Sequence, residues 1–326
     1  MSHFLRLAVF GIVAILAGCS PPAGAPVGTT PASRSSSGWS TLQSIKTPAV
    51  VAVDTQASNL VYWPISRNGG SRAAVIAHIP GLNGTTSMAA DGNTVVLAVA
   101  NPRELVLYNT QSGRQTTLED PGLPSDVAID KNGTIYANNY SNSGVAVAMY
   151  APGSAAPTVL KCGLLSQGVF LTPDNEGDLI VAGYNTSTSG AIEFQNGAGG
   201  LQSGKCSVLP LRLSFDNLAS ILVDPKTDDL IVLHNPGQCA GGVEGQITVY
   251  PKPYEYKTEH SRNAGGVCPG PMRLAADSKS AFIVDASFKW GTNVVRQVSM
   301  PDGEFMASYR GVFPTAVTTV PNSLPN

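Results

Sequence analysis

The stretch PSDVAIDKNGTIYANNY, residues 124–140, contains a short apolar strand, a turn rich in Asp, Asn and Gly, and a second apolar strand. Short Asp and Asn side chains bond to nearby backbone N–H groups and favour turns. The second strand ends in three polar residues, Asn138, Asn139 and Tyr140. The stretch therefore predicts a β-hairpin with polar side chains at both ends.

Similar hairpins recur along the chain, roughly every 40–50 residues, which is the period of β-propeller blades. In each hairpin the first strand ends in an acidic residue, and these residues are Asp54, Asp91, Asp130, Asp174, Asp224 and Asp277. A third apolar strand follows each hairpin, and fourth strands follow several of them. We therefore predict six four-stranded blades, with residues 48–54 as the inner strand of the first.

The segment PTAVTTV, residues 314–320, looks like a further first strand without a partner hairpin. We interpret it as a closing strand that ties the last blade to the first, beside residues 39–43. A seventh, incomplete blade is the alternative.

The pattern P-x-x-VAVD-x-x-G-x-(I/L)-Y resembles the blades of NHL-repeat proteins and related six-bladed propellers of the SMP-30 type. The resemblance covers the chain from about Thr47 to its end. It implies an all-β fold, a six-bladed β-propeller of four-stranded antiparallel blades. Because this superfamily contains binding scaffolds, hydrolases and lyases, the resemblance implies no catalytic residue.

The first residues resemble the signal of a bacterial lipoprotein. An apolar run at residues 7–17 is shorter than the roughly 20 residues that a membrane-spanning helix needs, and it ends in Leu-Ala-Gly-Cys, similar to a lipobox. The resemblance implies a signal peptide at residues 1–18, lipidation of Cys19, and attachment to a membrane of the bacterial envelope through that lipid. Ser20 resembles the residue of lipoproteins sorted to an outer membrane, if the source has one. A plain secretory signal with a chance Cys is the alternative.

Residues 19–38 are rich in Pro, Ala, Gly, Ser and Thr. Such a composition buries too little apolar area to fold, so we expect a flexible tether, followed by the propeller domain at residues 39–326. The net charge of −2 and the low charged fraction of 13%, without a basic cluster, argue against a nucleic-acid partner.

Beyond Cys19 the chain has four cysteines, an even number that favours disulfides in an exported protein and allows three connectivities. Cys239 and Cys268 lie in loops that we expect on the same face, so we predict that they pair. Cys162 and Cys206 would form the second pair by elimination. The spacing of Cys and His does not suggest a structural zinc site.

The six acidic residues at the hairpin turns recur in every blade, and we predict that they stabilise the turns. Calcium ligation by a few of them is the alternative. The far ends of the second strands and the loops after them differ between blades, and they offer the amides, imidazole, carboxylate and aromatic rings expected of a concave site for a polar ligand. The candidate ligand-binding residues are Trp63, Asn101, Asn138, Asn139, Tyr140, Tyr184, Asn185, His234, Asn235, Asp285 and Trp290. For His234, Asp285 and Asn185 are the expected hydrogen-bonding partners.

A resemblance to gluconolactonase-type propellers implies an enzymatic alternative. It would be a lactonase-like hydrolase with Ca²⁺ or another divalent cation on the propeller axis, held by groups such as Asn138, Asn185, His234 and Asp285. That family has a Glu at the start of the first inner strand, where this chain has Pro48-Ala49-Val50. The chain also contains no G-x-S-x-G, phosphate-loop or H-E-x-x-H motif.

The sequence therefore favours a lipid-anchored scaffold that binds an unknown small molecule or partner protein. We expect no catalysis of its own, no cofactor and no metal.

Overall fold

The computed structural model describes residues 45, 48–70, 72–185, 188–211, 213, 218–234, 245–255, 259–264, 269–274, 278–285 and 294–320. Several predictions concern other residues and lie outside this part of the chain. They are the signal peptide, Cys19 and the tether, residues 39–43, Asp277, the Cys239–Cys268 pair, and the site residues Asn235 and Trp290.

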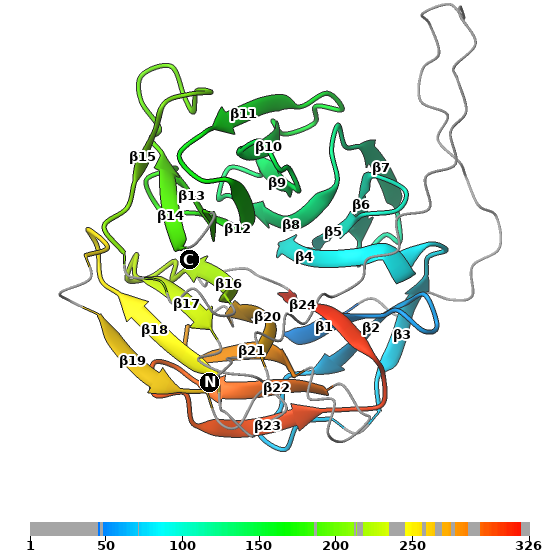
Figure 1. The fold of residues 1–326 in the computed structure, drawn as a ribbon. Helices are drawn as coiled ribbons and strands as arrows, with labels where there is room; N and C mark the ends of the chain where they lie inside the picture. The colour runs from blue at the N-terminus through cyan, green and yellow to red at the C-terminus, as the bar shows by residue number, and fades with distance from the viewer. Residues whose placement is uncertain are drawn as a thin grey trace, which may run out of the picture. The chain divides into compact units, whose positions relative to one another are not determined.

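The described strands form six antiparallel sheets of four strands, arranged as blades around a central axis (Figure 1). Blade 1 contains β24 (Pro314–Val320), β1 (Ala49–Asp54), β2 (Asn59–Pro64) and β3 (Ala74–His78). After the short 3-10 helix η1 (Leu82–Gly84), blade 2 contains β4 (Thr85–Asp91), β5 (Thr94–Val99), β6 (Glu104–Asn109) and β7 (Gln115–Glu119). Blade 3 contains β8 (Pro124–Ile129), β9 (Ile135–Asn139), β10 (Val145–Tyr150) and β11 (Thr158–Cys162).

The other three blades have the same strand order. Blade 4 contains β12 (Gln167–Pro173), β13 (Leu179–Tyr184), β14 (Ser189–Phe194) and β15 (Cys206–Val208). Blade 5 contains β16 (Leu218–Val223), β17 (Leu230–His234), β18 (Gln246–Tyr250) and β19 (His260–Asn263). Blade 6 contains β20 (Pro269–Leu274), β21 (Ser280–Asp285), β22 (Val294–Ser299) and β23 (Phe305–Tyr309). The predicted six-bladed β-propeller is confirmed.

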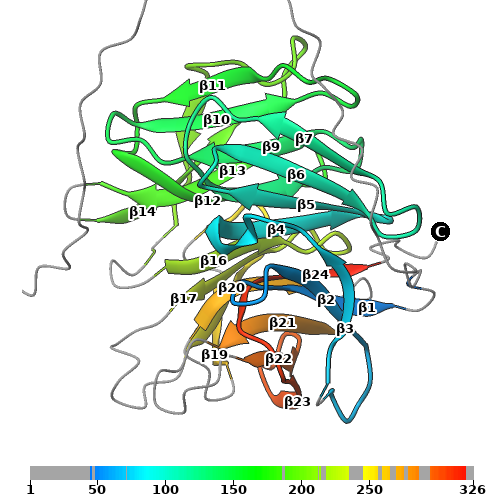
Figure 2. The ribbon, with the colours of Figure 1, turned by 90° about the vertical axis from the view of Figure 1, so that its right-hand side faces the viewer.

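The first strand of each blade lies nearest the axis, and the others follow outward, as Figure 2 shows for β4 to β7. The inner strands contact one another in the order β24, β4, β8, β12, β16 and β20, and β20 contacts β24. In this ring β20 and β8 lie opposite each other across the axis, so side chains from these two strands can meet only by crossing it.

Blade 1 differs from the prediction in one respect. The segment 314–320 does close the ring, but it does so as the inner strand β24, which pairs with β1. The segment Ala49–Asp54 is therefore the second strand and not the inner one, and Asn59–Pro64 is the third. The prediction was wrong because a strand packed between two blades is apolar on both sides, whether it is first or second in its blade.

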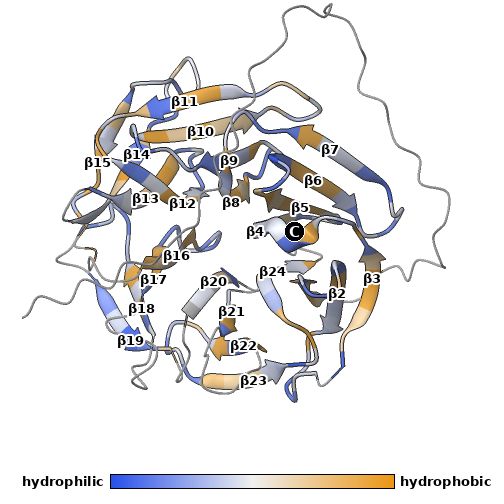
Figure 3. Ribbon diagram, turned by 45° about the vertical axis from the view of Figure 1, so that its right-hand side comes forward, coloured by the Kyte–Doolittle hydropathy of each residue, from blue (hydrophilic) through white to orange (hydrophobic). Residues whose placement is uncertain are grey.

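The core lies between the blades. Among the described residues, buried apolar side chains form six clusters, each located between two neighbouring blades. In β1, Val51 and Val53 pack toward blade 2, whereas Val50 and Ala52 pack toward blade 6. This two-sided packing explains why the sequence shows continuous apolar runs in place of clean alternation, as in the hydrophobic colouring of β5 (Figure 3).

A disulfide joins Cys162 of blade 3 to Cys206 of blade 4, with 6.3 Å between the Cα atoms. This is the pair expected by elimination. No helix in the described part of the chain is long and apolar enough to cross a membrane.

Candidate functional site

The two ends of the blades carry different residues. We call the end with Asp91, Asp130, Asp174 and Asp224, between first and second strands, the turn face. We call the opposite end the loop face; here the inner strands begin and the second strands finish, for example at Pro124 and Asn139, which pair with each other.

On the turn face, the acidic residues hold their own turns. One carboxylate oxygen of Asp130 accepts hydrogen bonds from the backbone N–H groups of Asn132 (2.8 Å) and Thr134 (2.9 Å). Asp174 accepts in the same way from Glu176 (2.9 Å) and Asp178 (2.8 Å). The predicted turn role is confirmed for these residues, because their carboxylates satisfy turn N–H groups that would otherwise have no partner.

An ionic cluster extends from the turn of blade 4. Lys252 Nζ lies 2.8 Å from Asp174, 2.7 Å from Asp228 and 3.2 Å from Glu176. Burial alone would lower the pKa of Lys252, but hydrogen bonds with these carboxylates outweigh burial and raise it. Lys252 therefore joins the turns of blades 4 and 5 as a permanent cation.

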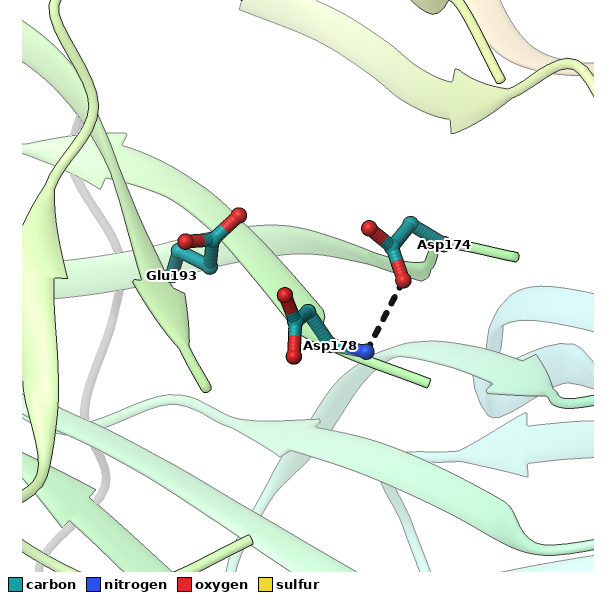
Figure 4. Close-up of side chains that lie close together, drawn as sticks. All are labelled: Asp174, Asp178 and Glu193. Atoms are coloured by element: carbon teal, nitrogen blue, oxygen red, sulfur yellow. Dashed lines mark hydrogen bonds between the residues drawn. The ribbon is translucent and has the colours of Figure 1, made fainter. Parts of the chain in front are cut away.

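Three carboxylates of blade 4, from Asp174, Asp178 and Glu193, offer ligand atoms within 4.8 Å of one another (Figure 4). Burial, with the nearby charge of Asp178, raises the pKa of Glu193. Both carboxylate oxygens of Asp174 are already engaged, one by two backbone N–H groups and one by Lys252. The geometry thus fits an ion-pair network that stabilises the turns, and it gives no separate indication of a ligand.

The axis itself is crossed by Arg273 of β20. Its guanidinium donates to the carbonyl of Met88 (2.9 Å), to Ser87 Oγ (3.0 Å) and to the carbonyl of Val127 (3.1 Å), and it lies 3.4 Å from Asp126 Oδ1. The buried Asp126 also accepts from Ser87 Oγ (2.5 Å) and from the N–H of Leu171 (2.9 Å). This network links inner strands on opposite sides of the ring.

On the loop face, Asn138 and Asn139 are buried at the end of β9, with 0% and 4% exposure. Asn138 Nδ2 donates to Ser125 Oγ (2.8 Å), and its Oδ1 has no partner among the described residues. The Oδ1 of Asn139 also lacks one. The next residue, Tyr140, is 48% exposed.

The other predicted residues of blades 2 and 4 are less enclosed. Asn101 is exposed after β5. Tyr184 packs partly against the cluster between blades 4 and 5, and burial raises its pKa. Asn185 is exposed, and its Oδ1 accepts from the N–H of Ser166 (3.0 Å), so this side chain holds the loop before β12.

His234 and Asp285 contact other residues than those expected. His234 Nε2 hydrogen bonds with Thr248 Oγ1 (2.9 Å), and its Nδ1 is buried without a partner among the described residues. Burial lowers the pKa of His234. Asp285 is fully buried and accepts from Arg296 Nε at 2.6 Å.

Trp63 does not belong to the loop face. Since β2 is the third strand of blade 1, Trp63 lies near its turn-face end. Trp63 is 1% exposed, its ring packs against that of Tyr309, and its indole N–H donates to the carbonyl of Arg310 (3.2 Å). Its selection as a site residue followed from the wrong strand order in blade 1, and its contacts are those of a core residue.

Buried polar atoms without partners gather on the loop face. In the described part of the chain, nine buried side-chain oxygen or nitrogen atoms have no hydrogen-bond partner. Seven of them lie at strand ends on the loop face: Asp54 Oδ1, Thr85 Oγ1, Asn138 Oδ1, Asn139 Oδ1, Ser189 Oγ, His234 Nδ1 and Thr315 Oγ1. Each such atom is costly unless water or a ligand satisfies it.

The loop face also exposes apolar side chains. Leu123 (37%), Tyr140 (48%), Leu164 (45%) and Phe313 (36%) all lie in connections at this end of the blades. Leu123 and Tyr140 are adjacent, because the N–H of Tyr140 donates to the carbonyl of Leu123 (2.8 Å). Apolar side chains beside unsatisfied polar atoms are the mixture found in binding surfaces.

Sequence reasoning missed the axial network and several of the partnerless atoms. Ser87, Asp126 and Arg273 each stand four residues before the Asp that ends their hairpin strand, a shared position that could have been noticed. Thr85, Ser189 and Thr315 stand at the starts of strands, whereas the predicted site residues lie at or after strand ends.

No family model matches the sequence, and no curated protein matches it. Solved structures do resemble the fold. A chain of a nidogen/laminin complex aligns with a TM-score of 0.65 and 16% identity over 85% of this chain and 99% of that chain. TolB from Acinetobacter baumannii aligns with a TM-score of 0.60 and 10% identity, over 84% and 66% of the respective chains. A putative gluconolactonase aligns with a TM-score of 0.55 and 11% identity, over 79% and 91%. At these identities the resemblance shows the fold alone.

Proposed function

We propose that the protein is a lipid-anchored, extracytoplasmic β-propeller that binds a small molecule or a partner protein on its loop face and has no catalysis of its own. The observation that supports it is the concentration of partnerless buried polar atoms at the strand ends of this face. A ligand that supplies the missing hydrogen bonds would recover the free energy that these atoms cost in the free protein.

The scaffold suits such a role. The strand ends are fixed by the blade clusters and by hydrogen bonds such as that from Asn138 to Ser125. A preorganised site loses little conformational entropy when a ligand binds. The fold resembles proteins of several kinds, a nidogen/laminin complex, TolB and a putative gluconolactonase, so the choice of a binding role rests on the site and not on the resemblance.

The alternative is a metal-dependent, lactonase-like hydrolase with a divalent cation on the axis. The guanidinium of Arg273 crosses the axis, and it shares the carboxylate of Asp126 with Ser87 and Leu171. A divalent cation at this level would be repelled by Arg273 and would compete for Asp126. The observed network therefore favours the binding role.

The binding role can be tested with Asn139→Leu, which removes a partnerless amide oxygen and keeps the branched shape of the side chain. The full-length protein, purified in detergent, would be screened by thermal shift against sugars, amino acids and dicarboxylates. We expect the variant to lose the stabilisation given by the best compound, yet to be about 1 kcal/mol more stable than the wild type without it, because a buried unsatisfied group has been removed.

The matched control is Asn132→Leu, which changes an exposed amide on the turn face. It should leave the ligand effect unchanged. Binding that survives Asn139→Leu but is lost in the control would overturn the choice of face, and chelator-sensitive turnover of a lactone would overturn the non-catalytic role.

The anchor has its own test. Metabolic labelling with a palmitate analogue should mark the wild type but not Cys19→Ala, which should remain unprocessed or leave the membrane fraction. Equal labelling of both proteins would contradict lipidation at Cys19.

A further inference from the structure

A cavity of about 370 Å³ lies at the loop-face end of blade 3, away from the axis. One wall comes from the connection between β9 and β10 and from the end of β11, with Ser141, Ser143 and Lys161. The other wall comes from Ser203 and Gly204, in the connection between β14 and β15 of blade 4. The volume is in the range of sites for small ligands, roughly 300–1,000 Å³.

The wall from blade 4 is fixed against blade 3. The N–H of Gly204 donates to the carbonyl of Lys161 (2.7 Å), and the N–H of Lys161 donates to Ser203 Oγ (3.1 Å). Two residues further on, Cys206 is bonded covalently to Cys162, which also lines the cavity. The cavity is therefore preformed by contacts between two blades.

All of its polar side chains can donate hydrogen bonds. Ser203 Oγ accepts a bond from the backbone of Lys161, which leaves its own O–H free to donate. Ser141 and Ser143 share one hydroxyl–hydroxyl bond (3.0 Å), so one of their two O–H groups is also free. The ammonium of Lys161 adds a positive charge.

In the described part of the chain, no carboxylate forms an ion pair with Lys161. Among the described residues that line the cavity, Lys161 is the only charged one. At the edge, the exposed side chains of Tyr140 and Leu164 adjoin the lining residues Ser141 and Gly163 in the chain. They offer apolar surface for a carbon skeleton.

We propose that this cavity binds a small hydroxylated anion, with Lys161 facing the anionic group and the serine hydroxyls facing the ligand's own oxygens. The inference deepens the proposed function and rests on it, because most of the residues that line the cavity belong to the loop-face end of blade 3. Carboxylate and phosphate share this chemistry, and the test separates them.

Calorimetric titration of the full-length protein in detergent would use glucuronate, glucose 6-phosphate and, as the neutral comparison, glucose. We expect at least one anion to bind about tenfold more tightly than glucose, since hydrogen bonds between charged groups are stronger than neutral ones. Lys161→Met should lower the affinity for that anion by about tenfold, whereas Lys161→Arg should largely keep this affinity.

Lys205→Met is the matched control, because Lys205 is exposed nearby but does not line the cavity. If Lys205→Met and Lys161→Met lower the affinity for the anion equally, the anion responds to the general positive charge of this surface, and the proposed site is wrong. If neither anion binds, the proposed ligand class is wrong. The proposed function is then still tested separately by the Asn139→Leu variant.

The second wall gives an independent measurement. The double variant Cys162→Ser with Cys206→Ser should bind the anion several-fold less tightly, because Ser203 and Gly204 are then no longer held against blade 3 by the disulfide. If that variant does not fold, the amide resonances of Gly144 and Gly204 in the wild type should shift on titration with the anion, and unchanged resonances would contradict the location.

Discussion

Arg273 is well suited to cross the axis, because a planar guanidinium carries five N–H donors and no acceptor. Here it donates to carbonyls of β4, β8 and β20 as well as to two side chains. A lysine at this position would supply three donors from a single nitrogen and could not reach these groups together. The network connects inner strands that share no backbone hydrogen bonds.

Replacing Arg273 with Met should destabilise the fold by about 3 kcal/mol or more, because Asp126 would remain buried without its cation. Urea unfolding followed by circular dichroism measures the loss. The double change Arg273→Met with Asp126→Asn should recover a substantial part of it. The exposed Arg114→Met serves as control and should stay within about 0.5 kcal/mol of the wild type. An Arg273→Met protein as stable as this control would contradict a structural role of the axial bridge.

His234 should make stability depend on pH. Since burial lowers its pKa in the folded protein, the unfolded chain binds the proton more readily. The stability that neutral His234 contributes is fully present above the pKa of an unfolded His, which is about 6.5. This stability is lost as the pH falls below that value and through the lowered pKa of His234 in the folded protein. The change can reach at most about 1.4 kcal/mol per pH unit.

The measurement is the free energy of unfolding at pH 7.5 and 5.5 for the wild type and for His234→Gln. The Gln amide can still bond with Thr248 but does not titrate, so the variant should lose less stability on acidification. His260→Gln, which changes an exposed histidine, serves as the control. If the stability of the wild type and of His234→Gln depends equally on pH, His234 does not cause the pH dependence.

Among the elements, the repeated hairpins were predictable because each blade needs the same turn chemistry and the same two-sided apolar strands. Asp130 and Asp174 illustrate this, since both carboxylates bind N–H groups two and four residues later. The order of strands in blade 1 was not predictable from these features. Val50 and Val51 face opposite blades in β1, as they would in an inner strand, and only the pairing with β24 distinguishes the two positions.

The candidate site was predictable in part for a similar reason. Asn138 and Asn139 were chosen as candidates because the second-strand ends vary between blades, and their role in binding stays a prediction. The contacts of Lys252 with Asp174 and of Arg273 with Asp126 join residues 78 and 147 positions apart. Local patterns contain no information about which distant side chains meet, so these networks became visible only in the folded ring.

The closing strand β24 gives a prediction at this scale. Val317 is fully buried between blades 6 and 1, and Ala316 packs into the cluster between blades 1 and 2. Val317→Asp would place an unpaired charge in that interface and should cost about 3 kcal/mol or more. Phe313→Asp changes an exposed residue just before the same strand and should have little effect. Thermal unfolding of the two variants makes the comparison, and equal melting temperatures would refute closure through β24.

In the molecule as a whole, ring closure makes every blade interface depend on the others. One interface can open only if the ring spreads, and its opening breaks one of the six apolar clusters between the blades. The hydrogen bonds of β24 prevent spreading at blade 1, and the disulfide prevents it between blades 3 and 4. The two closures lie in different parts of the ring and act by different chemistry, so they can be removed separately.

The covalent closure spans 44 residues of sequence, and loops of this size typically give a disulfide a stabilising effect of about 2–4 kcal/mol. Replacing Cys162 and Cys206 together by Ser should lower the free energy of unfolding by that amount in urea titrations without reductant. Adding reductant should bring the wild type down toward the variant. If reductant lowers the free energy of unfolding of the variant as well, this would indicate the second predicted disulfide, between Cys239 and Cys268. If the variant and the oxidised wild type unfold at the same urea concentration, the disulfide between blades 3 and 4 does not stabilise the ring. Its role would then be to hold the cavity wall beside Lys161.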